Sequence, residues 1–275
     1  MMELFSYSFF VRVLIASILI SIACGIVGAY ITARRIVFLS GSISHASFGG
    51  IGMGHYFGFN PIIGAGIFAV IAALAIEKIS QKKGMRIDSI IGILWSFGMA
   101  VGLIFIFMTP GYAPNLVSYL FGNILTVSPF DLVLVSIITF AIIFVFIVFF
   151  REILYIAFDE EYALTLGIPV KALNYLMLGL VALTIVISIK AVGIILVISL
   201  LTIPQVTAGL LTGDFKKMIF LSIGFALLSS LAGLAVSYTL EIPSGAAIIF
   251  TATFCFVITN IIKSIFTRSK RNIPA

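Results

Sequence analysis

Long stretches without any Asp, Glu, Lys or Arg constrain the fold of this 275-residue chain more than any other feature. A helix rises about 1.5 Å per residue and needs about 20 apolar residues to cross the hydrocarbon core of a bilayer. Residues 36–76 are long enough for two crossings, with a turn signature at Gly58-Phe59-Asn60-Pro61. The sequence therefore predicts an all-α, polytopic transmembrane helix bundle of about nine spans. The predicted spans are residues 13–33, 36–76 (two spans), 89–108, 132–150, 172–189, 191–211, 218–240 and 246–262.

The composition excludes a soluble fold. The chain is 62% hydrophobic and 9% charged, whereas soluble domains are about 45–50% apolar and about 25% charged. We therefore expect residues 1–275 to form a single transmembrane domain in contact with the lipid bilayer. The net charge of +6 is interpreted as a membrane-orientation signal, not as a sign of a nucleic-acid partner.

The positive charges predict an orientation. If the loops after spans one, three, five and seven share one side with the C-terminal tail, all of the 16 basic residues except Arg12 and Lys190 lie on that side. Cytoplasmic loops are enriched in Lys and Arg, so we expect the C-terminus inside the cell and the N-terminus outside. Spans six and seven meet at Lys190, where no clear turn signal separates them. Residues 109–130 are predicted to form a loop with a short interfacial helix.

Two spans carry polar residues that hydrocarbon alone would not tolerate. Polar groups within a membrane must face protein or water, so span two is predicted to lie in the interior, along a cavity. In span seven, Pro204 and Gln205 predict a broken helix, which is typical of a transport path. The glycines from Gly49 to Gly54 are interpreted as a packing run. The polar residues of span two are Ser40, Ser42, Ser44, His45, Ser47 and His55.

The polar block 151–171 predicts a short capped helix. Asp159 is a suitable N-cap, and Glu160 and Glu161 complement the positive end of the helix dipole. Gly167 and Pro169 would end the helix. Such an element is either a surface helix lying on the membrane or a docking element for a soluble partner. The residues predicted to dock are Asp159, Glu160, Glu161, Tyr162, Ala163, Leu166, Gly167, Ile168 and Pro169.

Several segments together resemble one family, the ABC-3 type metal-ion permeases. Glu161-Tyr162-Ala163, followed three residues later by Gly167, is similar to the coupling helix of ABC importer permeases, which fits a groove on the ATPase. The run Gly41–Gly50 looks like the Ser-His-Ala stretch of the family. The other similar segments, in family order, are residues 88–93, 120–125, 158–170, 192–197, 203–208 and 242–246.

The resemblance implies a membrane assembly that imports zinc, manganese or iron. It implies two copies of this chain, two cytoplasmic ATP-binding subunits and an extracytoplasmic metal-binding protein in the cell membrane. ATP and magnesium would be used by the partner ATPase, because this chain has no Gly-rich phosphate loop ending in Gly-Lys-Ser/Thr. We therefore expect a transport subunit without its own ATPase site or bound cofactor.

His45 is the leading candidate for a residue that touches the metal. Imidazole binds zinc, manganese and iron(II), and a histidine within a span is unusual. The alternative is a packed histidine that bonds to a neighbouring helix. The resemblance puts an Asp one turn before this His, but this chain has Gly41 there, which leaves the cargo open. The other candidates along the path are Ser42, Ser44, His55 and Glu241.

Other transport classes fit less well. An ion-coupled secondary transporter needs carboxylates inside the membrane, and none lies well inside a predicted span. A permease for a metal chelate stays open as an alternative. An intramembrane enzyme would need a catalytic partner for His45, and span two offers none. Asp88, at the start of span four, is predicted to cap that helix.

Overall fold

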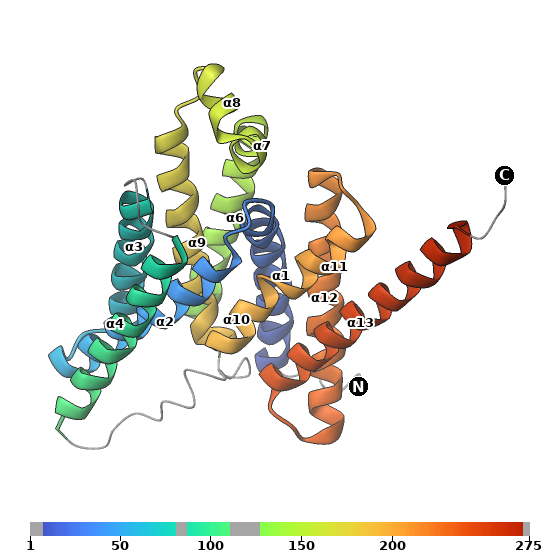
Figure 1. Ribbon diagram of the computed structural model, residues 1–275. Helices are drawn as coiled ribbons and strands as arrows, with labels where there is room; N and C mark the ends of the chain where they lie inside the picture. Colours follow the sequence, from blue (N-terminus) through green and yellow to red (C-terminus); the bar gives the residue numbers. More distant parts are fainter. Residues whose placement is uncertain (1–7, 81–86, 111–126, 272–275) are drawn as a thin grey trace.

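The computed structural model describes residues 8–80, 87–110 and 127–271, and all of its regular structure in these ranges is helical. Figure 1 shows the helices as a bundle of long rods, with α7 and α8 projecting at one end. We refer to that end as the α7–α8 end. The helices are α1 (Ser8–Ala33), α2 (Val37–Phe57), α3 (Pro61–Ser80), α4 (Ile87–Met108), α6 (Pro129–Val148), α7 (Phe150–Phe158), α8 (Glu160–Thr165), α9 (Val170–Val192), α10 (Ile194–Leu200), α11 (Ile203–Leu211), α12 (Phe215–Leu240) and α13 (Ser244–Arg271).

The prediction of an all-α bundle with about nine spans is confirmed. Within the described ranges, eight helical segments are long and apolar enough to cross a membrane, and α10 with α11 counts as one of them. The helix α2 is not among these eight, because its serines and glycines lower its hydropathy, although its 21 residues are long enough for a crossing. The predicted loop 109–130 and the similar segment 120–125 lie mostly or wholly outside the described residues.

Two helix boundaries differ from the prediction. The helix α9 continues past Lys190 to Val192, and the turn into α10 is made by Gly193 at φ 83° and ψ 162°. Glycine adopts this backbone conformation far more readily than other residues, so Gly193 was the missed signal. Asp88 is not an N-cap, because α4 already begins at Ile87. It lies in the first helical turn, where a carboxylate complements the helix dipole.

The predicted break in span seven is confirmed. The helix α10 ends at Leu200, and α11 begins at Ile203 with Pro204 in its first turn. Proline is tolerated there, because the first N–H groups of a helix have no intrahelical partner. The break therefore falls just before Pro204.

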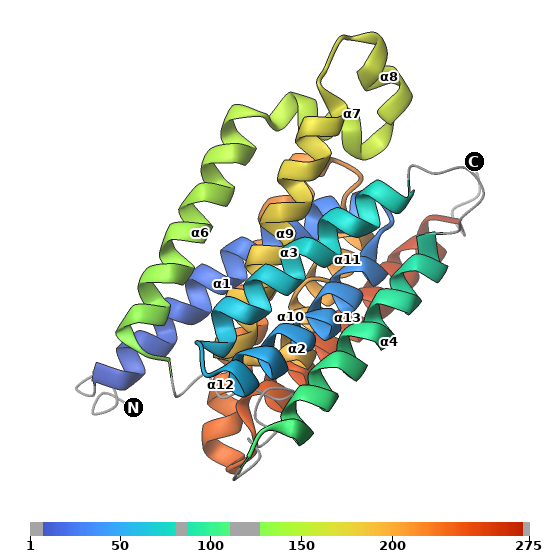
Figure 2. The same ribbon diagram turned by 90° about the vertical axis from the view of Figure 1, so that its left-hand side faces the viewer.

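Glycines bring α2 into direct backbone contact with α3 and α4. A Cβ atom on Gly50 would overlap the backbone of Gly64 in α3, and one on Gly52 would overlap Gly102 in α4. Gly98 of α4 lies equally close to the backbone of Ala46. Figure 2 shows α2 running between these two helices. The packing role predicted for the glycine run is confirmed.

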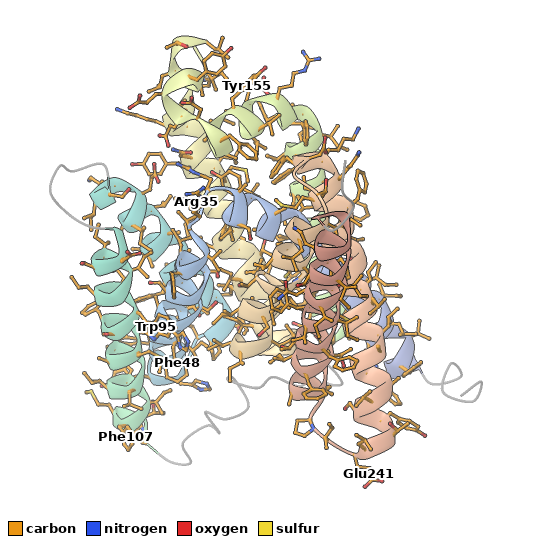
Figure 3. The ribbon with its side chains drawn as sticks, turned by 45° about the vertical axis from the view of Figure 1, so that its right-hand side comes forward. Arg35, Phe48, Trp95, Phe107, Tyr155 and Glu241 are labelled. Atoms are coloured by element: carbon orange, nitrogen blue, oxygen red, sulfur yellow. The ribbon has the colours of Figure 1, made fainter. Side chains whose placement is uncertain are left out.

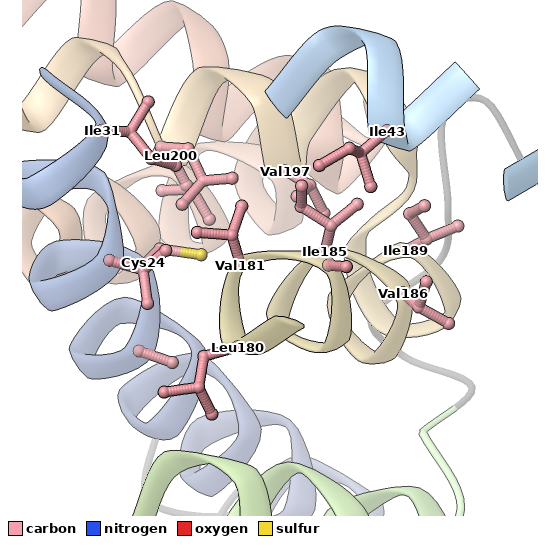
Figure 4. Packing of buried hydrophobic residues seen from close by; sticks show 14 of the residues in the cluster. Cys24, Ile31, Ile43, Leu180, Val181, Ile185, Val186, Ile189, Val197 and Leu200 are labelled. Carbon is pink, nitrogen blue, oxygen red and sulfur yellow. The ribbon is translucent and has the colours of Figure 1, made fainter. Parts of the chain in front are cut away.

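The core lies where α1, α9 and α10 meet, and Ile43 of α2 reaches it. Cys24 of α1 is a free thiol within this core, and it packs near Val181 of α9 (Figure 4). The outer faces of the bundle are also apolar, because many large side chains are exposed on α4, α6 and α13. A chain that spans a membrane presents such faces to lipid or to other subunits.

The contact between α2 and α3 gives the first prediction. Gly50→Ala should lower the free energy of unfolding by about 1–3 kcal/mol, because the added methyl group overpacks against Gly64. Gly92→Ala is the matched control, because a Cβ at Gly92 meets no atom within 4 Å. Thermal unfolding of the purified protein in detergent measures both variants. Equal melting temperatures for the two variants would contradict the packing role of Gly50.

Candidate functional site: a stacked histidine and a tethered end helix

His45 lies on α2 with its imidazole stacked against the indole of Trp95 from α4. The ring centroids are 4.2 Å apart, and the ring planes differ by 12°. The Nδ1 atom of His45 is buried and has no hydrogen-bond partner within the described part of the chain. Figure 3 shows Trp95 within the bundle, between Arg35 towards one end and Glu241 at the other.

The serines near His45 bond to backbone carbonyls. The Ser42 hydroxyl donates to the carbonyl oxygen of Ile91 in α4 at 2.9 Å. The Ser44 hydroxyl donates to the carbonyl oxygen of Ser40 at 2.7 Å. These bonds satisfy the serine protons inside the membrane, while the hydroxyl oxygens keep lone pairs. The candidacy of Ser42 and Ser44 as weak ligands stays a prediction.

The remaining predicted path residues lie apart from His45. His55 is ten residues further along the same helix, which corresponds to about 15 Å, so the two rings do not share one metal ion. Glu241 is exposed at the C-cap of α12, away from Trp95 (Figure 3). Among the described residues, no group of three or more His, Cys, Asp and Glu side chains is placed to hold a metal ion.

Three cavities in the bundle lie between other helices, and the cavity predicted along α2 stays a prediction. An apolar cavity of about 580 Å³ lies between α1, α6 and α12. A smaller one of about 170 Å³ lies beside Thr202 and Val206, next to α13. The serines of α2 are buried among packed helices, and His45 is partly exposed beside Trp95.

Gln205 holds the broken helix together. Its side chain is fully buried, and its Nε2 donates to the carbonyl oxygens of Cys24 at 2.9 Å and Leu200 at 3.0 Å. Carbonyls at the end of a helix lack intrahelical partners, so Gln205 satisfies one that the break releases and joins α11 to α1. Its Oε1 is buried with no partner among the described residues. Gly28 lies against this amide, and a side chain there would displace it.

The capped helix predicted in the block 151–171 is present as α8. The Asp159 side chain accepts a hydrogen bond from the Tyr162 backbone N–H at 2.9 Å. Gly167 ends the segment at φ +74°, a left-handed conformation that favours glycine. The sequence analysis missed α7, a separate helix that precedes α8 and buries Ile153, Ile156 and Ala157.

The two short helices form a projecting tip at the α7–α8 end (Figures 1 and 2). Ala163 is buried, and Ile168 packs beside it in a small apolar cluster with Ile156. Tyr162, Leu164 and Leu166 are about half exposed, at 50%, 57% and 49%. Exposed apolar side chains on a rigid tip are typical of a docking surface.

A polar network tethers this tip to the bundle. The guanidinium of Arg34, just after α1, forms an ion pair with Glu160 of α8 at 2.5 Å. It also donates to the Asn174 side-chain oxygen of α9 at 2.7 Å and to the Tyr30 hydroxyl at 3.1 Å. The Asn174 amide donates in turn to Glu160 at 3.2 Å and to Glu77 of α3 at 3.3 Å. Four helices therefore meet through one cluster of five residues.

The acidic groups of the network keep Arg34 in its charged form. Burial lowers the pKa of the Arg34 guanidinium, but Tyr30, Glu160 and Glu77 outweigh it and raise that pKa above its ordinary value. Arg34 therefore stays charged and paired. Glu160 was predicted for its effect on the helix dipole, and the structure adds its anchoring role. No sequence signal links Arg34 to Glu160, because they lie 126 residues apart.

Comparison with known proteins places the chain among membrane transport proteins. The model of the ABC 3 transport family matches residues 6–263. The manganese transport system membrane protein MntC of Halalkalibacterium halodurans is 37% identical over 256 residues, with 93% of this chain and 88% of that protein covered. An uncharacterized membrane protein of Synechocystis is 40% identical over 259 residues, with 94% and 92% covered. The solved structure of PsaBC from Streptococcus pneumoniae, in complex with Fab, matches with a TM-score of 0.82, 34% identity and coverage of 92% and 91%.

The tether of α8 gives the second prediction. Arg34→Gln should lower the free energy of unfolding by about 1–2 kcal/mol, because the ion pair and two further hydrogen bonds of a half-buried cation are lost. It should also make residues 159–168 more sensitive to limited proteolysis. Exchange of the charges, Arg34→Glu with Glu160→Arg, should recover part of the loss. The neighbouring exposed Arg35, changed to Gln, is the control. Identical digestion of the Arg34 and Arg35 variants would contradict the tether.

Proposed function

Because this chain belongs to the ABC 3 transport family, we propose that it is the membrane-spanning permease subunit of an ATP-driven importer of divalent metal ions. The relatives named above support manganese as the cargo, since one of them is a manganese transport system membrane protein. A second named relative, from Streptococcus parasanguinis, is a manganese import system permease. Zinc and iron(II) are the competing cargoes, and a metal chelate is the further alternative.

The structural observation that supports this proposal is the position of His45. His45 places a partly exposed imidazole against α4, with a buried Nδ1 that no described group bonds. Neutral imidazole is a ligand for manganese, zinc and iron(II). Its environment is otherwise apolar aromatic surface and backbone-bonded serines. We infer that cargo passes along α2 and contacts His45 during transport.

The proposed assembly follows from the two ends of the bundle. We infer that the α7–α8 end is cytoplasmic and docks a separate ATP-binding subunit, which uses ATP and magnesium. The opposite end, where Glu241 is exposed, would face an extracytoplasmic metal-binding protein. A second copy of this chain would complete the permease in the cell membrane, with the N-terminus outside and the C-terminus in the cytoplasm.

The network around Arg34 supplies a route from the ATPase to the path. Movement of α8 would carry Glu160, and the bonds of Arg34 and Asn174 would pass that movement to α1, α9 and α3. The helix α3 packs by its backbone against α2 at Gly64. A displacement of α3 would therefore also displace α2, the helix that carries His45, because closely packed elements transmit strain.

The third prediction tests the path. In proteoliposomes that contain the permease and its ATPase, His45→Ala should reduce ATP-dependent manganese uptake at least about tenfold, which corresponds to about 1.4 kcal/mol or more of lost interaction. The variant should remain folded with a slightly lower melting temperature, because it loses the stack on Trp95 but no hydrogen bond of the buried Nδ1. His55→Ala, on the same helix, tests whether the outer part of α2 contributes. Normal uptake by His45→Ala would remove His45 from the path.

Parallel assays with zinc, iron(II) and chelated metal identify the cargo. Uptake of manganese in preference to the others supports the proposal. Uptake of a chelate, with no uptake of free ions, would overturn the proposed substrate class while leaving the permease role intact.

The fourth prediction tests the docking tip. Gly167→Ala should weaken co-purification with the ATPase and reduce uptake, because a left-handed backbone strains any residue with a Cβ by about 1–2 kcal/mol. Deletion of Glu160–Gly167 should abolish both. Gly179→Ala in α9 is the matched control, since a Cβ there meets no atom within 4 Å. An intact complex with full uptake after the deletion would exclude the docking role.

A further inference from the structure

Trp95 is the single tryptophan of the chain. It has no role so far in the proposed transport path through His45. Its indole lies nearly parallel to the imidazole of His45, at 4.2 Å between centroids and 12° between planes. Aromatic pairs in favourable geometry contribute about 0.5–1.5 kcal/mol beyond the area they bury. The stack therefore favours one orientation of the His45 ring.

Gly41 provides the space that the indole occupies. It lies one helical turn before His45 on the same face of α2. A Cβ atom at this position would lie 3.2 Å from Cζ3 of Trp95 and 3.7 Å from Cη2. A longer side chain would have to displace the indole from the imidazole. Gly41, His45 and Trp95 thus form one unit across α2 and α4.

The backbone beneath this unit is fixed. Gly98 and Gly102, one and two turns beyond Trp95, are in backbone contact with α2. One turn before Trp95, the carbonyl of Ile91 accepts the hydrogen bond from Ser42. These contacts hold α4 against α2, so rotation of the Trp95 side chain is the direct way to change its distance from His45.

A histidine that binds metal is usually oriented by a hydrogen bond from its other ring nitrogen to a carboxylate or carbonyl. The buried Nδ1 of His45 makes no such bond within the described residues. The aromatic stack is the contact that can orient the ring instead. A metal ion binds to a nitrogen lone pair in the plane of the ring, so an indole against the ring face leaves the coordinating edge open.

We propose that Trp95 is a positioning residue for metal transport, which holds the His45 imidazole in the orientation that binds the divalent cation. Gly41 leaves the space in which the indole lies. The inference rests on the proposed function and adds the residue that sets the ligand geometry. The edge of the Trp95 indole, at Cζ3 and Cη2, lies against the position that a side chain at residue 41 would occupy.

The first test uses the fluorescence of Trp95 itself, in the permease–ATPase complex with an ATPase whose tryptophans are changed to Phe. Mn²⁺ or Co²⁺, both paramagnetic, should quench the Trp95 emission saturably, because ions bound at His45 lie next to the indole. Diamagnetic Zn²⁺ should compete and relieve the quenching. His45→Ala should abolish the saturable component. Saturable quenching of equal affinity in His45→Ala would overturn the proposal.

The second test separates positioning from packing. Trp95→Leu should raise the apparent KM for manganese at least about fivefold, whereas Trp95→Phe, which keeps a flat ring, should restore most of the affinity. Gly41→Leu should reproduce the Trp95→Leu phenotype. Phe97→Leu is the matched control, because this neighbouring aromatic of α4 is exposed on the outer surface.

An unchanged KM in Trp95→Leu, with wild-type uptake intact, would overturn the role of Trp95 and leave the proposed function standing. Absence of metal uptake by the wild-type complex would overturn the proposed function itself. If Trp95→Leu fails to fold, the KM of Gly41→Leu decides the proposal: a raised KM supports the positioning role of Trp95, and an unchanged KM overturns it.

Discussion

Direct backbone contact at glycines is the constraint on which the interior of this protein depends. The helix α2 is too polar to face lipid, so it must be enclosed by other helices. Gly50 and Gly52 allow α3 and α4 to approach it closely enough to exclude lipid from its serines. The same approach brings Trp95 against His45. Larger residues at the contacts would separate the helices and expose the polar face.

The helix α3 connects the two candidate sites of the molecule, the surroundings of His45 and the α7–α8 tip. Near its start, Gly64 packs against Gly50 of α2, and near its end Glu77 accepts a hydrogen bond from Asn174. Asn174 also bonds Arg34 and Glu160, which anchors the projecting tip. A continuous series of contacts therefore runs from the tip to the helix of His45. Rigid helices with packed interfaces are suited to transmit such displacements as whole-body movements.

Local signals in the sequence predicted features that depend on neighbouring residues alone. Charge-free runs predicted the spans, Asp159 predicted its cap, and Gly167 predicted the end of α8. The turn at Gly193 was missed because Lys190, three residues earlier, marked the junction instead and no Pro, Asn or second Gly stands beside Gly193, so the backbone conformation identifies it. The helix α7 was missed because its apolar face packs against the bundle within a block that reads as polar overall.

By itself, the sequence determined that this is a transmembrane helix bundle with a polar second span and a capped helix at one end, because hydrophobicity and capping act over a few residues. It also marked His45 as the unusual group inside the membrane. Only the tertiary structure decided what surrounds that group. The pairing of Trp95 with His45 and of Arg34 with Glu160 joins residues 50 and 126 positions apart. Such contacts arise from the way whole helices pack, which no local pattern encodes.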